Sequence, residues 1–207
     1  GVRTFSEINA TMSELTGVAA NSSAVLNTYQ LLRQQLPATE DINAFVPANI
    51  IGISQLAFEY CNELVENDTL RTNFFGTFAF ESNVSVAFGT GLSTQKQQIV
   101  NALYDNMLGI PQTPGDDTTT LATSIDRATL MTELVDPANV VVGDPFLLPT
   151  ATPGNAGNLF DRLMRSCGTG GAANNEVDCA NTSGVGTREF VKAMCTTVLG
   201  SAAMLVQ

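Results

Sequence analysis

The sequence predicts an all-α fold: a single-domain helical bundle of six to eight helices, with long ordered loops and disulfide links. Apolar residues recur three and four positions apart in most long segments, which is the pattern of amphipathic helices. None of these segments shows the alternation of apolar and polar residues that a half-buried strand requires. The chain has 207 residues, 44% of them hydrophobic. It is therefore long enough to bury one core, and we expect one domain over residues 1–207.

Two helices are expected at the start of the chain. The first begins near Thr4 or Ser6, because either side chain is a suitable N-cap, and it ends before Gly17. The second spans residues 22–36. Pro37 ends it, because the residue before a proline is disfavoured in the helical conformation.

The third expected helix runs from Val46 or Pro47 to Glu66. Its apolar residues cover a wide face: Ile50, Ile51, Ile53, Leu56, Ala57, Tyr60, Cys61, Leu64 and Val65. A helix that is apolar over so much of its circumference is usually buried, so we place it at the centre of the bundle. Asp68 is then a suitable N-cap for a short fourth helix.

A Phe-rich, Gly-containing stretch follows, with neither helical nor strand periodicity. It holds five of the 11 Phe residues, namely Phe74, Phe75, Phe78, Phe80 and Phe88. One interpretation is an apolar patch that docks against a neighbouring subunit, with Phe75, Phe78 and Phe80 as interface residues. The other, which the sequence favours, is a loop that plugs one end of the bundle.

Four further helices are expected over residues 93–107, 116–134, 158–165 and 187–207. The mainly apolar part of the last helix is about 15 residues long, whereas a bilayer core needs about 20. We therefore expect a buried or docking helix there and no membrane span.

Residues 136–157 form a Pro-rich and Gly-rich segment that is too apolar for a free linker. We expect an ordered arm that lies on the body of the protein or on a neighbour. Its candidate interface residues fall in two clusters: Val140, Val141, Val142, Phe146, Leu147 and Leu148.

The four cysteines show no metal-binding spacing. Cys167 and Cys179 flank a segment without apolar anchors. A disulfide between them is therefore expected to order the loop region 168–186, with a contribution of about 3 kcal/mol. Cys61 and Cys195 lie in apolar helical patterns, where they either join two helices or remain buried thiols; we predict the Cys61–Cys195 bond. Two disulfides indicate an oxidising compartment outside the cytoplasm.

Composition excludes several kinds of function. The chain has no His, which removes His-based catalysis and His-ligated haem, and its net charge of −11 argues against nucleic-acid binding. Gly168 to Gly171 lack the strand and the Lys of a phosphate-binding loop. We therefore expect no enzymatic activity, no cofactor and no dedicated metal site. One open alternative is Ca²⁺ binding by oxygen ligands of the Cys167–Cys179 loop, from Asn174, Asn175, Glu176 and Asp178.

Four stretches carry a resemblance to a known group of proteins. They are Arg3 to Met12 with Leu15 to Val18, Gln34 to Pro37, Gln55 to Asn62, and Val198 to Ala203. Through them the chain resembles a helical region of uncharacterised bacterial surface proteins, mostly marine gammaproteobacterial, some of which carry LamG-type domains. The resemblance implies an exported bacterial protein and leaves its activity open.

These observations lead to two functional hypotheses. The first is a non-enzymatic extracellular structural subunit that assembles with copies of itself into a filament or surface layer. Its low-charge surface, rich in Thr and Asn, loses little desolvation energy on docking. The alternative is a helical interaction module of a larger cell-surface adhesin, which binds neighbouring surface proteins and for which Ca²⁺ is a candidate ligand.

Overall fold

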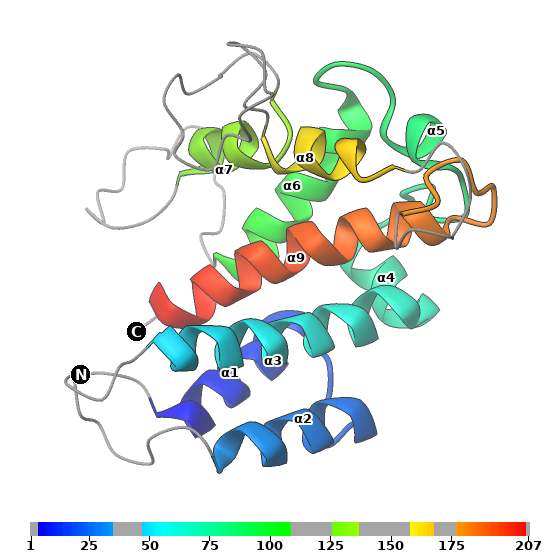
Figure 1. The fold of residues 1–207 in the computed structure, drawn as a ribbon. Coiled ribbons are helices and arrows are strands. Elements are labelled where there is room, and N and C mark those ends of the chain that lie inside the picture. Colours follow the sequence, from blue (N-terminus) through cyan, green and yellow to red (C-terminus); the bar gives the residue numbers. More distant parts are fainter. Residues whose placement is uncertain (1–3, 35–46, 109–125, 137–157, 168–176, 206–207) are drawn as a thin grey trace. The chain divides into compact units, whose positions relative to one another are not determined.

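The computed structural model describes residues 4–34, 47–108, 126–136, 158–167 and 177–205 (Figure 1). In these ranges the chain forms nine helices and no strand, so the predicted all-α class is confirmed. The number exceeds the six to eight predicted, because a five-residue helix, α5 (Val84–Phe88), lies in the Phe-rich stretch that we expected to be irregular. Five residues are too few to show a helical period.

The chain divides into two compact units, each built from segments distant in sequence. Unit 1 comprises Gly1–Gly76, Leu103–Ser124 and Cys195–Gln207, and unit 2 comprises Thr77–Ala102 and Ile125–Met194. Helices α6 (Thr94–Met107) and α9 (Val185–Leu205) contribute residues to both units. A single domain over residues 1–207 stays a prediction.

Helix α1 (Phe5–Thr16) begins and ends at residues that the sequence marks. Thr4 is the N-cap: its hydroxyl accepts a hydrogen bond from the Glu7 backbone N–H, while the Glu7 carboxylate accepts one from the Thr4 N–H at 2.7 Å. This reciprocal pair satisfies two backbone donors of the first turn. At the other end Gly17 takes a left-handed conformation with φ 70°, which favours glycine.

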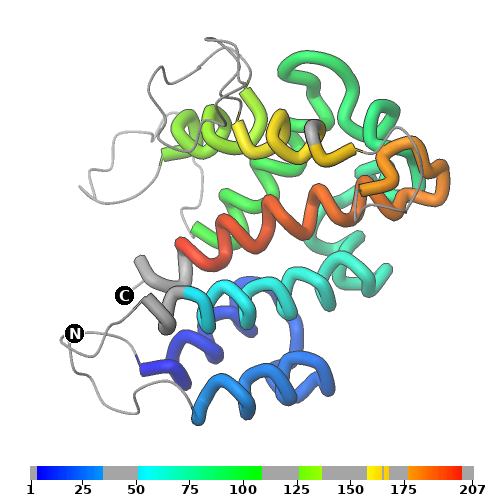
Figure 2. The backbone as a smooth tube through the Cα atoms, viewed as in Figure 1, coloured from blue at the N-terminus to red at the C-terminus, as the bar shows by residue number. Residues whose placement is uncertain are grey.

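Helix α3 (Pro47–Glu66) is the central helix of unit 1, and its bounds match the prediction. The helices that pack against α3 include α1, α2 (Ser23–Arg33) and α4 (Asp68–Phe75). Figure 2 shows α1 and α2 beside α3. Leu56, Tyr60 and Leu64 are fully buried on the packed face. Ile51 was expected to be buried as well, but that expectation is wrong, because 61% of Ile51 is exposed.

The N-cap of α4 differs from the prediction. The capping side chain is Asn67, whose Oδ1 accepts hydrogen bonds from the backbone N–H groups of Thr69 and Leu70, both at 3.1 Å. Asp68 instead accepts a hydrogen bond from Arg71 at 2.7 Å on the helix surface. The two adjacent side chains are both good caps, so the sequence alone did not decide between them.

In unit 2, α7 (Arg127–Leu134) begins later than the helix expected over 116–134. The expectation of one continuous helix there is wrong, because the backbone of Asp126 is extended (φ −74°, ψ 163°). Asp126 is the N-cap of α7 and accepts a 2.6 Å hydrogen bond from the Thr129 N–H, which lowers the pKa of the Asp126 carboxyl group. Residues 116–125 lie outside the described residues. Helix α8 (Leu159–Arg165), capped by Asn158, matches the expected helix 158–165 and packs on α7.

The first turn of α9 is fixed to the segment Phe80–Ser82 of unit 2. The Thr187 hydroxyl donates to the Ser82 carbonyl at 2.6 Å, and Arg188 forms an ion pair with Glu81 at 3.0 Å. Just before the helix, Gly184 has φ 77°, and a Cβ atom there would lie 1.7 Å from the Phe80 carbonyl oxygen. This approach requires glycine.

No helix in the described part of the chain is both long enough and apolar enough to cross a membrane. The last expected helix, 187–207, is observed as Val185–Leu205, and residues 206–207 lie outside the description.

Candidate functional site

The predicted disulfide between Cys61 and Cys195 is present in unit 1. It joins α3 to α9 with a Cα–Cα distance of 5.8 Å, and both cysteines are fully buried. The bond links positions 134 residues apart. Its burial makes it a structural link between two helices rather than a reactive group.

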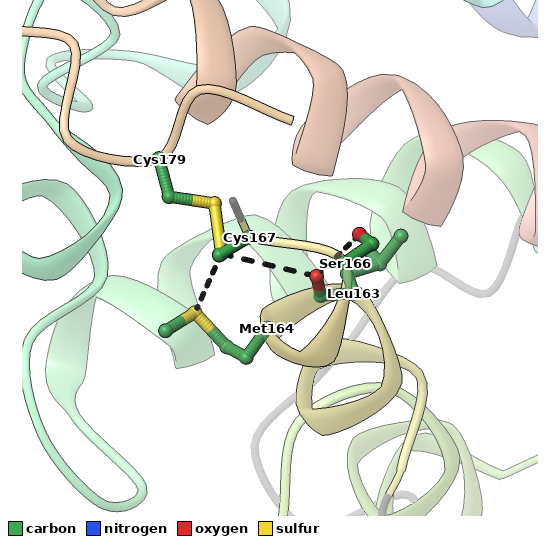
Figure 3. Close-up of a disulfide and its surroundings, with 5 residues drawn as sticks. All are labelled: Leu163, Met164, Ser166, Cys167 and Cys179. Atoms are coloured by element: carbon green, nitrogen blue, oxygen red, sulfur yellow. Dashed lines mark hydrogen bonds between the residues drawn. A yellow bond between two sulfur atoms is a disulfide. The ribbon is translucent and has the colours of Figure 1, made fainter. Parts of the chain in front are cut away.

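The predicted disulfide between Cys167 and Cys179 is also present, in unit 2 (Figure 3). It joins the turn after α8 to the segment before α9, with a Cα–Cα distance of 5.4 Å. A backbone hydrogen bond from Val177 N–H to the Ser166 carbonyl, 3.0 Å long, supports the same junction. Both cysteines are partly exposed. We call this junction the clip; the residues 168–176 that it encloses lie outside the description.

The candidate Ca²⁺ ligands Asn174, Asn175 and Glu176 fall in that undescribed segment. Asp178 is described and exposed, and its carboxylate accepts a 3.2 Å hydrogen bond from the Asn181 side chain. Among the described residues no group of three or more His, Cys, Asp or Glu side chains is placed to hold a metal ion. Ca²⁺ binding therefore stays an untested alternative.

The predicted interface residues fall into two sets with different outcomes. The arm clusters lie outside the described residues: Val140, Val141, Val142, Phe146, Leu147 and Leu148. Phe75, Phe78 and Phe80 are described and buried, with 2%, 7% and 4% of their surface exposed. Their burial agrees with a plug, and it leaves none of these three rings exposed for docking.

The buried Phe residues of unit 2 form a connected aromatic cluster. Phe78 contacts Phe80 and Phe88 at centroid distances of 4.9 and 5.1 Å, and Phe88 contacts Phe160 at 5.0 Å. Phe190 of α9 packs on Phe160 at 5.3 Å. The cluster therefore joins the Phe-rich stretch to α8 and α9, an arrangement that has no sequence period and that sequence analysis missed.

A buried cation completes this cluster. The Lys96 ammonium group lies 4.0 Å from the centroid of the Phe160 ring and donates to the Gly91 carbonyl at 2.8 Å. Burial lowers the pKa of Lys96, while the nearby Asp161 carboxylate opposes that shift. Lys96 is three residues before the buried Ile99 on α6 and therefore lies on the apolar face of that helix. This position in the sequence could have predicted that Lys96 is buried.

An exposed apolar face on α3 is the second feature that sequence analysis missed. Ile51 and Phe58 are 61% and 43% exposed, and they lie seven positions apart on one side of the helix. Ser54 and Gln55, which lie between them on that side, are also exposed and uncharged. We call these four residues the Ile51–Phe58 face. The apolar residues of α3 cover an unusually wide part of the helix in the sequence. This width was the signal that could have predicted the face, because some of these residues lie on the surface.

This sequence matches no family model, no curated protein and no solved structure.

Proposed function

We propose that the protein is a non-enzymatic extracellular structural subunit that associates with copies of itself. The observation that carries the proposal is the Ile51–Phe58 face: two large apolar side chains are exposed on one side of α3 without a charged residue between them. Isolated exposed apolar residues are common, but aligned ones on a rigid helix are typical of contact surfaces.

The disulfides support the compartment named in this proposal. Two disulfides and no free cysteine are consistent with an oxidising environment outside the cytoplasm. The Cys61–Cys195 bond also tethers α3, the helix that bears the proposed contact face. A covalently fixed helix loses less conformational freedom when it docks.

The charge of the chain sets the conditions under which association is expected. A net charge of −11 makes copies of the protein repel one another, whereas only 14% of the residues are charged, so few charged groups must be desolvated. Salt screens repulsion between exposed charges. Association should therefore strengthen as salt is added.

Sedimentation velocity of the oxidised protein over a concentration series, in low and moderate salt, tests the proposal. We expect species larger than the monomer at high concentration and more of them in moderate salt, with filaments or sheets in negative-stain images. A protein that remains monomeric under all these conditions contradicts self-assembly.

The second candidate function is a helical interaction module of a larger cell-surface adhesin. It is favoured by the clip, whose disulfide links the described residues that precede and follow residues 168–176. Such a module is monomeric and binds a neighbouring protein through that region. A monomer in sedimentation that loses partner binding after a change in the clip, but not after a change in the Ile51–Phe58 face, supports the module.

A further inference from the structure

We propose that the clip is a thiol-exchange site: a small thiol forms a mixed disulfide with Cys179 there, while the Cys61–Cys195 bond stays intact. A thiolate reaches the sulfur atoms of the clip more easily than those of the buried Cys61–Cys195 bond. Thiol exchange at the clip does not depend on self-assembly, because the clip lies in unit 2 and the Ile51–Phe58 face lies in unit 1.

The two disulfides differ in accessibility. Cys61 and Cys195 are fully buried within helices, so an attacking thiolate must wait for the helices to separate. Cys167 and Cys179 are partly exposed and lie outside helices, in a turn and in the segment before α9. Exchange depends on access to the sulfur atoms, so the clip reacts first.

The surroundings of the clip distinguish its two sulfur atoms. Met164 Sδ lies 3.9 Å from Cys167 Sγ, and Figure 3 shows it on the side of Cys167 that faces away from Cys179. The Leu163 carbonyl oxygen lies 3.9 Å from the same sulfur. A thiolate must approach the attacked sulfur from the side opposite the disulfide bond. At Cys167 the Met164 side chain covers that side.

Attack therefore falls on Cys179. The incoming thiolate forms a bond to Cys179 Sγ, the disulfide bond breaks, and its electron pair leaves on Cys167 Sγ. Cys167 then takes a proton from water. A second thiolate that attacks the sulfur of the small thiol releases Cys179 as a thiolate and completes a two-electron reduction.

The Cys179 end of the clip stays in place after exchange. Its carbonyl accepts a 3.1 Å hydrogen bond from the Val84 N–H. Gly186 of α9 packs so closely on this segment that a Cβ atom there would lie 2.6 Å from the Asp178 carbonyl oxygen. Opening the clip thus removes the covalent link between the turn after α8 and the segment before α9, and the hydrogen bond from Val177 N–H to the Ser166 carbonyl is left as a direct contact at this junction.

The test treats the oxidised full chain with increasing glutathione, quenches early time points with acid, and alkylates free thiols with N-ethylmaleimide before peptide mass analysis. We expect glutathione on Cys179, alkylation on Cys167, and opening of the clip at a glutathione concentration at least about tenfold below that needed for Cys61–Cys195. Opening of both disulfides at one concentration, or first alkylation at Cys179, overturns the proposal.

A pair of variants tests the role of Met164. Met164→Ala uncovers Cys167, so alkylation should be shared between Cys167 and Cys179. Met164→Leu restores the bulk without the sulfur atom, so alkylation should return to Cys167. Far-UV circular dichroism checks that both variants keep the helical content of the wild type. An unchanged labelling ratio in Met164→Ala contradicts the assigned direction of attack.

Discussion

Tyr60 shows at the scale of one residue how burial changes ionisation. The side chain is fully buried in α3, and its hydroxyl group donates toward the Asn9 side-chain and backbone oxygens at 2.8 and 3.1 Å. Burial raises the pKa of Tyr60 to about 12 from 10.0, an increase that a hydrogen bond with Ser13 opposes and Tyr29 assists. The folded state therefore favours the protonated phenol.

The raised pKa of Tyr60 predicts a loss of stability in alkaline solution. In the unfolded chain Tyr60 ionises near pH 10, whereas in the folded protein it keeps its proton up to about pH 12. The free energy of unfolding should have its full Tyr60 contribution below pH 10 and lose it as the pH rises toward 12. Tyr60→Phe should remove this part of the pH dependence and cost about 1 kcal/mol at neutral pH.

Urea unfolding at several pH values, with tyrosinate absorbance followed in parallel, measures this effect. If the wild type and Tyr60→Phe lose stability equally between pH 10 and 12, Tyr60 is not the group that links ionisation to folding.

Gly184 shows how a single residue permits close packing. We expect Gly184→Ala to lower the free energy of unfolding by about 3 kcal/mol, because the new Cβ atom clashes with the Phe80 carbonyl and the φ of 77° is strained for alanine. Gly200→Ala is the matched control. Gly200 lies inside α9 with open space around the new Cβ atom, so this change should stabilise the protein by about 0.5 to 1 kcal/mol. Thermal unfolding compares the two; equal effects would contradict the close approach at Gly184.

At the scale of elements, the cap of α4 gives a direct comparison of two neighbouring residues. Asn67→Ala removes the acceptor of two backbone N–H groups and should cost about 1 kcal/mol. Asp68→Ala removes only a surface ion pair with Arg71, and the Asp68 side chain is 87% exposed, so its cost should be smaller. Chemical denaturation of both variants measures the difference. A larger loss for Asp68→Ala would show that Asp68 is the cap after all.

Long helices were the elements that the sequence predicted best. The bounds of α3, α6 and α9 agree with expectation to within about two residues, because each has several turns of periodic apolar residues. Helix α5 was missed because five residues hold little more than one turn. The exposed position of Ile51 was missed because an apolar residue beside a buried stripe has no mark of its own in the sequence.

The candidate sites were predictable to different extents. Both cysteine pairings followed from the surroundings of each cysteine in the sequence, and the structure confirms them. The aromatic cluster was not predictable, since Phe78, Phe160 and Phe190 meet through long-range packing between segments without a shared period. The position of Met164 over the Cys167 sulfur was not predictable either, because it depends on the geometry of the turn after α8.

At the scale of the whole molecule, the two disulfides should contribute unequally to stability. The Cys61–Cys195 bond joins residues 134 positions apart, whereas the clip joins residues 12 apart. Chain entropy predicts a loss of about 5 kcal/mol for Cys61→Ala with Cys195→Ala, and about 3 kcal/mol for Cys167→Ala with Cys179→Ala. Calorimetry of the two double variants measures these losses. A larger loss for the clip variant would contradict this ranking.

The proposed function of the whole molecule depends on self-association through the Ile51–Phe58 face. The most direct test is sedimentation velocity of Ile51→Ser with Phe58→Ser beside the wild type and Val86→Ser at matched concentrations. Val86 on α5 is 64% exposed, so Val86→Ser is a control that removes exposed apolar surface elsewhere. We predict that the double variant remains monomeric with unchanged helical content, while the wild type and Val86→Ser associate to the same extent. Association of the double variant at the wild-type level would contradict self-association through the Ile51–Phe58 face.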